Sequence, residues 1–479
     1  MKRVIHWFRR DLRVSDNTAL YHACNDAEEV IPVYIVSTWK KTHPWTGPSR
    51  QEFLCGCLEA LARNLAALGG RLVIRFGEPE SELNRLVNES GAQAIYTNRG
   101  IDPYDVELEK RLIQDAKAWG VEFRSFQDVT IHAPDAVLTQ SGQPFRVFTP
   151  YARAWRELPR PPVLPKVSRL TTPPLIRSED VPTLAHWQLS PEAKIIEPGE
   201  RAARTRLKRL FSGPVFEYAE RRNLPGDPVN SRLSQDLRWG TLSPRQVFAA
   251  ADEAARVANG TERRSVETFM NEIVWREFYM QILWHHPEVL HRNFSDQFEH
   301  LRWDQNEGFF RRWCEGTTGF PLVDAGMREL QATGFMHNRL RMITAMFLTK
   351  DLHLHWRQGE KFFSQKLIDG DIASNNGGWQ WSAGTGADAS PYFRIQNPWN
   401  QTKTYDPEGL YIKQWVPELR DVRPADLIKP SSTPLARNYP VPMVDHARER
   451  EETLERFNEA KRAAGEPLPA GTAGRLASK

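Results

Sequence analysis

Cysteine is scarce in this chain of 479 residues, and no long apolar run is present. The four cysteines, Cys24, Cys55, Cys57 and Cys314, form neither the spacing of a zinc site nor a disulfide framework. This pattern favours reduced thiols, as in cytosolic proteins. The opening residues, MKRVIHWFRRDLRV, lack the apolar core of a secretory signal, and no run approaches the roughly 18 apolar residues of a membrane span. We therefore expect a soluble, cytoplasmic protein.

A strong excess of one charge is also missing. The chain has 64 basic and 60 acidic residues, which gives a formal net charge of +4. This balance does not demand a nucleic-acid partner, although a local basic groove is compatible with it. Because domains typically hold roughly 100–200 residues, the length predicts two or three of them.

The first 130 residues alternate strand and helix patterns. RVIHWF, EVIPVYIV, RLVIRF, AQAIYTN and VEFRSF are typical of buried strands, and helical patterns separate them. This alternation predicts a parallel sheet covered on both faces. The turn after the first strand, RRDLRVSDN, lacks the G-x-G-x-x-G dinucleotide fingerprint, so a ligand here would be held in another way.

Proline composition separates two parts of the chain. Nine prolines fall between Pro159 and Pro198, which predicts a long linker over residues 131–199. Residues 200–425 then show helical patterns with Pro or Ser-Pro at their starts and Gly at their ends. We expect an all-helical domain there, followed by an extension over residues 426–479 with one charged helix and a disordered end.

Tryptophan is abundant: the chain contains 16, and ten of them lie from Trp239 onward. Indoles usually bury most of their surface. The second half therefore contains an indole-rich interior or a site built from indoles.

One helical pattern carries an acid, an indole and a guanidinium on a single face. Glu272, Trp275, Arg276 and Tyr279 stand at i, i+3, i+4 and i+7. This combination suits a planar polar ligand such as a nucleobase. Packing without any ligand fits the pattern about equally well.

A second helical pattern places Asn338, Arg341 and Met342 on one face. Beside a core-facing stripe, Arg341 requires a buried or liganded acceptor. An internal ion pair to Asp369 or Asp371 is the structural interpretation of this pattern. A ligand that accepts hydrogen bonds from Arg341 is the functional one.

The segment IDGDIASNNGGWQW, from Ile368, is too polar for a core and too aromatic for an ordinary loop. Its acids could pair with Arg341 or accept hydrogen bonds from a ribityl chain or a flavin ring. Asn375 and Asn376 supply amides, and Gly377-Gly378 allows close backbone approach. Upstream, NSRLS (residues 230–234) could bind phosphate near a helix start or act only as a cap.

In this order after an α/β region, NSRLS, NEIVWREFY, FMHNRLRM, LIDGDIASNNGGWQW and PYFRIQNP closely resemble the photolyase/cryptochrome flavoproteins. HWFRRDLRVSDNTAL matches the opening of that family, and the resemblance covers residues 1–425. Within the family, the chain looks most like bacterial cyclobutane pyrimidine dimer photolyases of the class I type. The resemblance implies a Rossmann-like α/β antenna domain (residues 1–130) with a parallel sheet. The linker (131–199) would join it to an all-α FAD-binding catalytic domain (200–425).

The resemblance also implies a U-shaped FAD, with Asn375 facing the flavin N5. The residues at FAD-contact positions would be Tyr218, Asn230, Ser231, Arg232, Leu233, Ser234, Arg341, Asp369, Asp371 and Asn375.

The substrate implied by the resemblance is DNA containing a pyrimidine dimer, flipped into a pocket. Reduced FADH⁻ would absorb light and donate an electron that splits the dimer, and Glu272 would stabilise the radical anion. The residues that line the pocket would be Glu272, Trp275, Asn338, Met342 and Trp381. The residues that hold DNA phosphates would be Arg222, Arg276, Arg339 and Arg394. Electrons would reach the flavin through Trp303, Trp356 and Trp379.

Three alternative functions account for part of these features. A cryptochrome-type photoreceptor would also carry FAD and the tryptophan chain, but Asn375 and the pair Trp275 and Trp381 favour repair. A (6-4) photolyase typically carries His where Met342 stands. A nucleic-acid-binding module without catalysis would not need the acid-amide-indole segment.

The antenna chromophore is left open by the resemblance. Folate-binding relatives carry an Asn-Glu pair that NRGIDPYDVELEK lacks, so a deazaflavin, a second flavin or an empty site are the alternatives. We further expect a monomer with no membrane partner.

Overall fold

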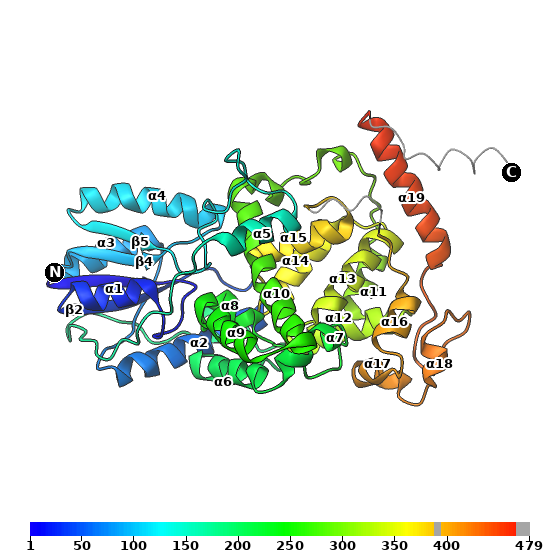
Figure 1. Cartoon of the computed structure of the whole chain (residues 1–479), viewed down its shortest axis with the longest axis horizontal. Coiled ribbons are helices and arrows are strands. Elements are labelled where there is room, and N and C mark those ends of the chain that lie inside the picture. Colours follow the sequence, from blue (N-terminus) through cyan, green and yellow to red (C-terminus); the bar gives the residue numbers. More distant parts are fainter. Residues whose placement is uncertain (388–393, 466–479) are drawn as a thin grey trace.

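The computed structural model describes residues 1–387 and 394–465. A parallel sheet of five strands occupies its N-terminal part, at the left of Figure 1, and helices make up the larger part at the right. The strand order is β3-β2-β1-β4-β5. The strands are β1 (Arg3–Phe8), β2 (Glu29–Val36), β3 (Val73–Phe76), β4 (Ala94–Asn98) and β5 (Glu122–Phe126). The predicted α/β and all-helical fold classes are confirmed.

Both faces of the sheet are buried because its strands are apolar on both sides. In β1, Val4 and Phe8 pack on one face with α1 (Thr18–Asp26) and α2 (Pro48–Ala67). Ile5 and Trp7 pack on the other face with α3 (Pro79–Ser90) and α4 (Pro103–Ala118).

The proline-rich segment returns along the sheet before it joins the helical part. It follows α5 (Phe148–Glu157) and contains the short helix η1 (Leu184–Trp187). Its backbone then bonds to the sheet domain, since the Val30 amide donates to the Thr171 carbonyl (2.9 Å) and the Glu179 amide donates to the Ile74 carbonyl (3.0 Å). The segment therefore packs on the first domain as well as connecting it.

The helical part contains two large buried clusters. One surrounds the long helix α10, and the other lies among α11 to α17. The elements before the turn at Asp369 are α6 (Glu200–Phe211), η2 (Pro214–Glu217), α7 (Tyr218–Arg221), α8 (Ser234–Trp239), α9 (Pro244–Val257), α10 (Gly260–His285), η3 (Pro287–Leu290), η4 (Asp296–Phe298), α11 (Glu307–Glu315), α12 (Pro321–Thr333), α13 (Asn338–Met346), η5 (Phe347–Asp351) and α14 (Trp356–Lys366). Those after it are α15 (Ile372–Ala383), α16 (Pro398–Tyr405), α17 (Leu410–Trp415), η6 (Pro417–Leu419), α18 (Pro424–Leu427) and α19 (His446–Ala463).

Local sequence signals set several helix ends. Ser243 and Gln246 form a reciprocal capping box at the start of α9, where Pro244 takes the first helical position. At the end of α12, Gly334 adopts φ 65°, a left-handed conformation that favours glycine.

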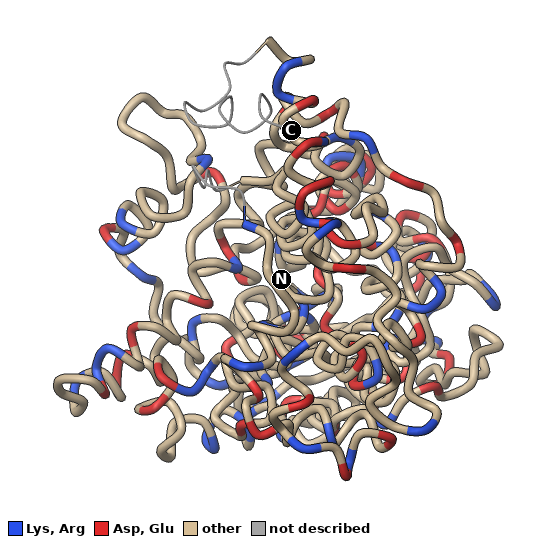
Figure 2. The backbone as a smooth tube through the Cα atoms, turned by 90° about the vertical axis from the view of Figure 1, so that its right-hand side faces the viewer, with Lys and Arg blue, Asp and Glu red and all other residues tan. Residues whose placement is uncertain are grey.

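The last described helix, α19, packs against the helical part near Trp303. Phe457 and Ala460 of α19 form a small buried cluster with Phe298 and Leu301, and Trp303 packs against it. Residues 466–479, for which we expected disorder, lie outside the described residues. Figure 2 shows basic and acidic segments interspersed on this side of the molecule, in keeping with the nearly balanced charge. Within the described ranges, no helix combines the length and apolar composition needed to cross a membrane.

Candidate functional site

The turn between α14 and α15 brings two carboxylates into the interior. Asp369 and Asp371 are both buried. Asp371 is the N-cap of α15, and its carboxylate accepts a hydrogen bond of 3.0 Å from the Ser374 amide, a role for which Asp is favoured. The turn is also held from α8, because Arg238 Nε donates to the Gly370 carbonyl at 3.0 Å. The sequence IDGD thus forms an acidic turn anchored at both sides.

Arg341 of α13 forms the internal ion pair that its sequence position indicated. Its Nη2 lies 2.7 Å from Asp369 Oδ2, and its Nε donates to the Met336 carbonyl at 2.8 Å. The other carboxylate oxygen, Asp369 Oδ1, is buried and finds no partner among the described residues. One acceptor in this pair therefore remains available for a donor group.

Buried and half-buried guanidinium groups surround Asp371. Burial raises the pKa of Asp371, but the charges of Arg238, Arg276 and Arg10 outweigh this effect and lower it. Burial and then the neighbouring Arg238 lower the pKa of Arg10 to about 10 and that of Arg50 to about 9. Arg238 Nη1 is buried without a partner in the described part of the chain. Bringing so many cations together favours an anionic ligand, because uncompensated buried charge is costly.

The carboxyl ends of β1 and β4 form the crevice where open parallel sheets usually bind ligands. Ion pairs fill this crevice: Arg9 pairs with Asp105 and Glu109, and Arg10 pairs with Asp102 and Asp105. The remaining cavity measures only about 10 Å³. Ion pairs rather than open space therefore occupy this end of the sheet.

The amides of the NNGG segment tie α15 to α14. Asn375 Nδ2 donates to the Glu360 carbonyl and to Ser364 Oγ, both at 2.9 Å. Asn376 Nδ2 donates to the Glu360 carboxylate at 2.9 Å, and burial raises the pKa of Glu360 to about 7. Asn375 is half-buried whereas Asn376 is buried. Of the two amides, Asn375 is therefore the more accessible to a ligand.

The NSRLS segment precedes α8 and contacts α13. Asn230 Oδ1 lies 3.0 Å from His337 Nε2. Arg232 adopts φ 53° and places its guanidinium 3.6 Å from the centroid of the Phe335 ring, with its buried Nε unpartnered among the described groups. Leu233 is buried. The remaining members of the predicted flavin set lie as follows: Ser231 is half-buried, Ser234 is exposed at the start of α8, and Tyr218 is buried against Phe269.

A second face joins α7, α10 and α13. Arg222 forms an ion pair with Glu272 of α10. Burial raises the pKa of Glu272, and Arg222 and Arg339 oppose that shift. Arg339 Nη2 donates to Asn223 Oδ1 at 2.7 Å. This face therefore carries two guanidinium groups around one acid.

The two predicted pocket tryptophans, Trp275 and Trp381, have different neighbours. The Trp275 ring stacks on Phe148 of α5 with centroids 3.6 Å apart and planes 6° apart. Trp381 is half-buried, and the guanidinium of Arg394 lies 5.3 Å from its ring centroid. Phe148 was not predicted, because a contact across 127 positions leaves no periodic signal in the sequence.

The other predicted residues of this face differ in exposure. Met342 accepts a weak contact from Arg339 Nη1 to its sulfur at 3.7 Å, and Asn338 is exposed at the start of α13. Arg276 points elsewhere, since it donates to the carbonyls of Val129 (2.9 Å) and Leu237 (3.2 Å). Arg276 therefore lies with the cations around Asp371, and its assignment to DNA phosphates stays a prediction.

Three predicted tryptophans differ in burial and partners. Trp379 is buried against Phe363 and Trp313, with ring centroids 5.0 Å and 6.0 Å away. Trp356 is fully buried and donates from Nε1 to Asn293 Oδ1 at 3.1 Å. Trp303 is half-buried. Two of the three are therefore buried, and Trp303 is the most accessible.

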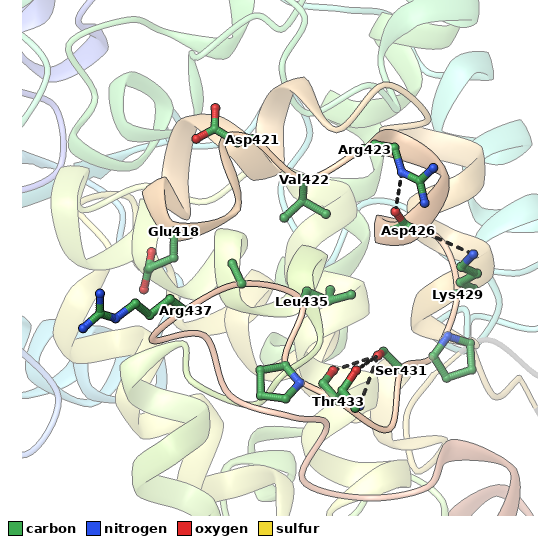
Figure 3. A pocket seen from close by; sticks show the side chains of 13 residues that line it. Glu418, Asp421, Val422, Arg423, Asp426, Lys429, Ser431, Thr433, Leu435 and Arg437 are labelled. Carbon is green, nitrogen blue, oxygen red and sulfur yellow. Dashed lines mark hydrogen bonds and ion pairs between the residues drawn. The ribbon is translucent and has the colours of Figure 1, made fainter.

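Two cavities lie away from the predicted flavin and DNA residues. One of about 640 Å³ is lined by residues 418–437 around α18, as Figure 3 shows. A second of about 1000 Å³ lies between η5 and α19. Among the described residues, no cluster of His, Cys, Asp and Glu could hold a metal ion. All four cysteines are free thiols.

Comparison with known proteins identifies the family. Residues 4–168 match the model "DNA photolyase", and residues 269–459 match the "FAD binding domain of DNA photolyase". A deoxyribodipyrimidine photo-lyase of Agrobacterium fabrum is 40% identical over 96% of this chain and 98% of its own. This chain belongs to the photolyase/cryptochrome family.

Two solved structures of the family resemble this photolyase-family chain. A class III photolyase of Agrobacterium tumefaciens has a TM-score of 0.90 and 39% identity, covering 96% of this chain and 98% of its own. A Synechocystis cryptochrome has a TM-score of 0.87 and 29% identity, covering 95% of this chain and 99% of its own. The predicted family is confirmed, whereas the class I type stays a prediction.

The cofactor of this photolyase-family chain is FAD, and the buried groups around the acidic turn fit its chemistry. FAD carries an anionic diphosphate and a ring with both donors and acceptors. The unpartnered nitrogens of Arg232 and Arg238 could donate to anionic oxygens, and Asp369 Oδ1 could accept from a ring N–H. Arg10, Arg50 and Arg238 were absent from the sequence-based set because lone arginines in helix or turn patterns carry no sign of burial.

Gly377 has a different neighbour from the one we expected. A Cβ placed there would lie 2.1 Å from the ring of Tyr279 in α10, so glycine is needed for helix packing. A Cβ at Gly378 would meet nothing within 4 Å. The position of Gly378 is therefore sterically open, unlike that of Gly377. The first three residues of PYFRIQNP (391–393) lie outside the described part of the chain.

Proposed function

We propose that this protein is a deoxyribodipyrimidine photo-lyase that repairs cyclobutane pyrimidine dimers in DNA under light. Photo-lyases that are 36–40% identical over almost their whole length support this carbon–carbon lyase activity. The observation that carries the proposal is the ion pair between Arg222 and Glu272, one helical turn from Trp275. An acid, a cation and a half-buried indole together suit a pyrimidine dimer that is extruded from its strand.

The residues of the second face would bind and orient the dimer. Trp275, stiffened by Phe148, would present one ring face, and Trp381 would hold the other side of the dimer. Glu272 would hydrogen-bond a pyrimidine carbonyl. Because burial raises the pKa of Glu272, its carboxyl group would more readily keep a proton to donate to that carbonyl. Asn338 and Met342 would complete the lining. When bound, FADH⁻ supplies a photoexcited electron for ring cleavage.

The cofactor side would use the groups around the acidic turn. Arg341, Asp369, Asp371 and Asn375 would hold the flavin and ribityl portions, and the cations of the buried cluster would offset the diphosphate charge. In addition to these, Tyr218 and the NSRLS segment, Asn230, Ser231, Arg232, Leu233 and Ser234, would line the cofactor.

DNA would be positioned by surface cations that contact phosphates without reading sequence. Arg222, Arg339 and Arg394 are the candidates whose guanidinium groups lie beside Glu272 or Trp381. Trp303, Trp356 and Trp379 would deliver electrons from the surface to an oxidised flavin. The protein would act as a monomer in the cytoplasm.

The proposal is tested by incubating dimer-containing DNA with reduced enzyme in blue light and in darkness. We expect dimers to disappear only in light, and Trp275→Ala to retain FAD while losing affinity for the damaged strand. Absence of light-dependent repair by the reduced wild type would refute the proposal.

The Synechocystis cryptochrome with a TM-score of 0.87 favours a second candidate, a blue-light photoreceptor. Such a protein would reduce its flavin in light but leave dimers intact. A (6-4) photolyase would instead act on (6-4) products, so the same assay should include DNA carrying that lesion. Met342, at the position where (6-4) enzymes typically carry His, predicts no such activity.

A further inference from the structure

His355 lies between two tryptophans of the proposed electron path. Its ring centroid is 5.2 Å from that of Trp303, with 46° between the planes. On its other side, the centroid of Trp356 is 5.8 Å away, with 33° between the planes. In the described part of the chain, Trp303 and Trp356 make no ring contact with each other. The imidazole is therefore the conjugated group that touches both indoles.

The orientation of this imidazole is fixed by its place at the start of α14. His355 is the N-cap of the helix, and its Nδ1 accepts a hydrogen bond of 3.1 Å from the Arg357 amide. Because a backbone amide can only donate, Nδ1 carries the lone pair and the remaining proton of the neutral ring lies on Nε2. Burial and then the neighbouring Arg357 lower the pKa of His355 to about 4, so the ring is neutral at pH 7.

We propose that His355 is a positioning residue that bridges Trp303 and Trp356 during photoreduction of the flavin. This inference rests on the proposed function and extends its tryptophan chain. One electron passes from Trp303 to the Trp356 radical cation. Trp356 is thereby reduced to its neutral form, and Trp303 is oxidised to a radical cation. No bond forms or breaks at His355, and no proton moves. The imidazole provides a π system between the two rings and adds no positive charge beside either radical cation.

Two substitutions separate a bridging role from a capping role. His355→Asn keeps a side-chain acceptor for the Arg357 amide, since Asn is a favoured N-cap, but it removes the ring. His355→Phe keeps an aromatic ring between the indoles but removes the acceptor. Bridging predicts that His355→Asn slows photoreduction by about tenfold or more, whereas His355→Phe stays within about threefold of wild type. A capping role alone predicts the opposite order.

His353 offers a matched control two residues earlier. Its Nε2 lies 2.8 Å from the Glu449 carboxylate of α19, and its φ of 53° is one that Asn tolerates. His353→Asn therefore makes the same chemical change outside the indole pair. We expect its photoreduction rate to equal that of wild type.

The experiment follows flavin absorbance under blue light with an external thiol reductant, starting from oxidised holoenzyme. Repair by chemically pre-reduced enzyme is measured in parallel and should be equal in wild type and all three variants. A His355→Asn rate equal to wild type, or slowing in His355→Phe but not in His355→Asn, would overturn the bridging role. Failure of pre-reduced wild type to repair dimers would instead refute the proposed function, because that assay does not use the tryptophan path.

Discussion

Replacement of Trp379 by Phe should stop photoreduction while leaving the fold nearly unchanged. The indole is buried, so the smaller phenyl ring loses packing worth about 1–2 kcal/mol. However, Trp379 Nε1 is buried with no partner among the described residues. Removing an unsatisfied N–H returns about 1–3 kcal/mol of desolvation cost. The two effects largely cancel, so the unfolding free energy should change by no more than about 2 kcal/mol.

Trp356→Phe provides the contrast. Trp356 Nε1 donates to Asn293 Oδ1 at 3.1 Å, and both residues are buried. The same substitution there breaks a hydrogen bond and leaves a buried acceptor unpaired, which adds about 1–3 kcal/mol to the packing loss. We expect Trp356→Phe to be clearly less stable than Trp379→Phe in denaturant unfolding, although both lose photoreduction.

A double-mutant cycle with Gly359 tests the packing argument directly. A Cβ on Gly359 would lie 2.0 Å from Cη2 of Trp379, one of the atoms that Phe lacks. Gly359→Ala alone should therefore destabilise the protein by about 1–3 kcal/mol through overpacking. In Trp379→Phe the same change should become neutral or stabilising, since Ala favours helix by about 1 kcal/mol over Gly.

The assay combines denaturant unfolding, blue-light photoreduction of oxidised flavin, and repair by pre-reduced enzyme. Pre-reduced Trp379→Phe should repair dimers at nearly the wild-type rate, whereas Trp381→Phe should photoreduce normally and bind dimers less tightly. Rapid photoreduction in Trp379→Phe would refute the electron path. Additive effects in the Gly359 cycle would refute the proposed contact.

Three further predictions concern DNA binding and pH. Arg339→Ala should flatten the slope of log affinity against log salt by about 0.7–0.9. Arg276→Ala should change the slope less, because backbone carbonyls hold the Arg276 guanidinium. The reverse order in a salt titration would contradict this. Phe148→Ala should weaken binding of dimer-containing DNA by about 0.5–1.5 kcal/mol without changing FAD content, since it removes the ring behind Trp275; equal affinities in a binding titration would show that the stack is unimportant. Burial raises the pKa of Glu360 to about 7 in the folded state, so wild-type stability should fall as pH rises from about 4.5 to 7. Glu360→Gln should therefore be more stable than wild type at pH 8 by up to about 3 kcal/mol, and this advantage should vanish near pH 4; a pH-independent difference in unfolding free energy would rule out this titration.

The elements that local patterns encode were predictable. Alternating β-branched strands and helices, such as RVIHWF and the following segment, define a parallel sheet because both periodicities are short-range. The ion pair between Arg341 and Asp369 was also foreseeable, since a buried guanidinium in an apolar stripe needs an acid and the chain offers two nearby in sequence. The long motifs sufficed for the family and for FAD.

The residues that pack behind the predicted site residues could be identified only from the tertiary structure. Phe148 behind Trp275, and Arg10, Arg50 and Arg238 around Asp371, come from segments far apart in the chain. His355 likewise carries no local sequence signal of its contact with Trp303, which lies 52 positions earlier. Periodicity and capping act over a few residues and are written in the local sequence. Ring stacking and charge clustering join positions whose separation is set only when the linker and helices pack, and so only the tertiary structure decided them.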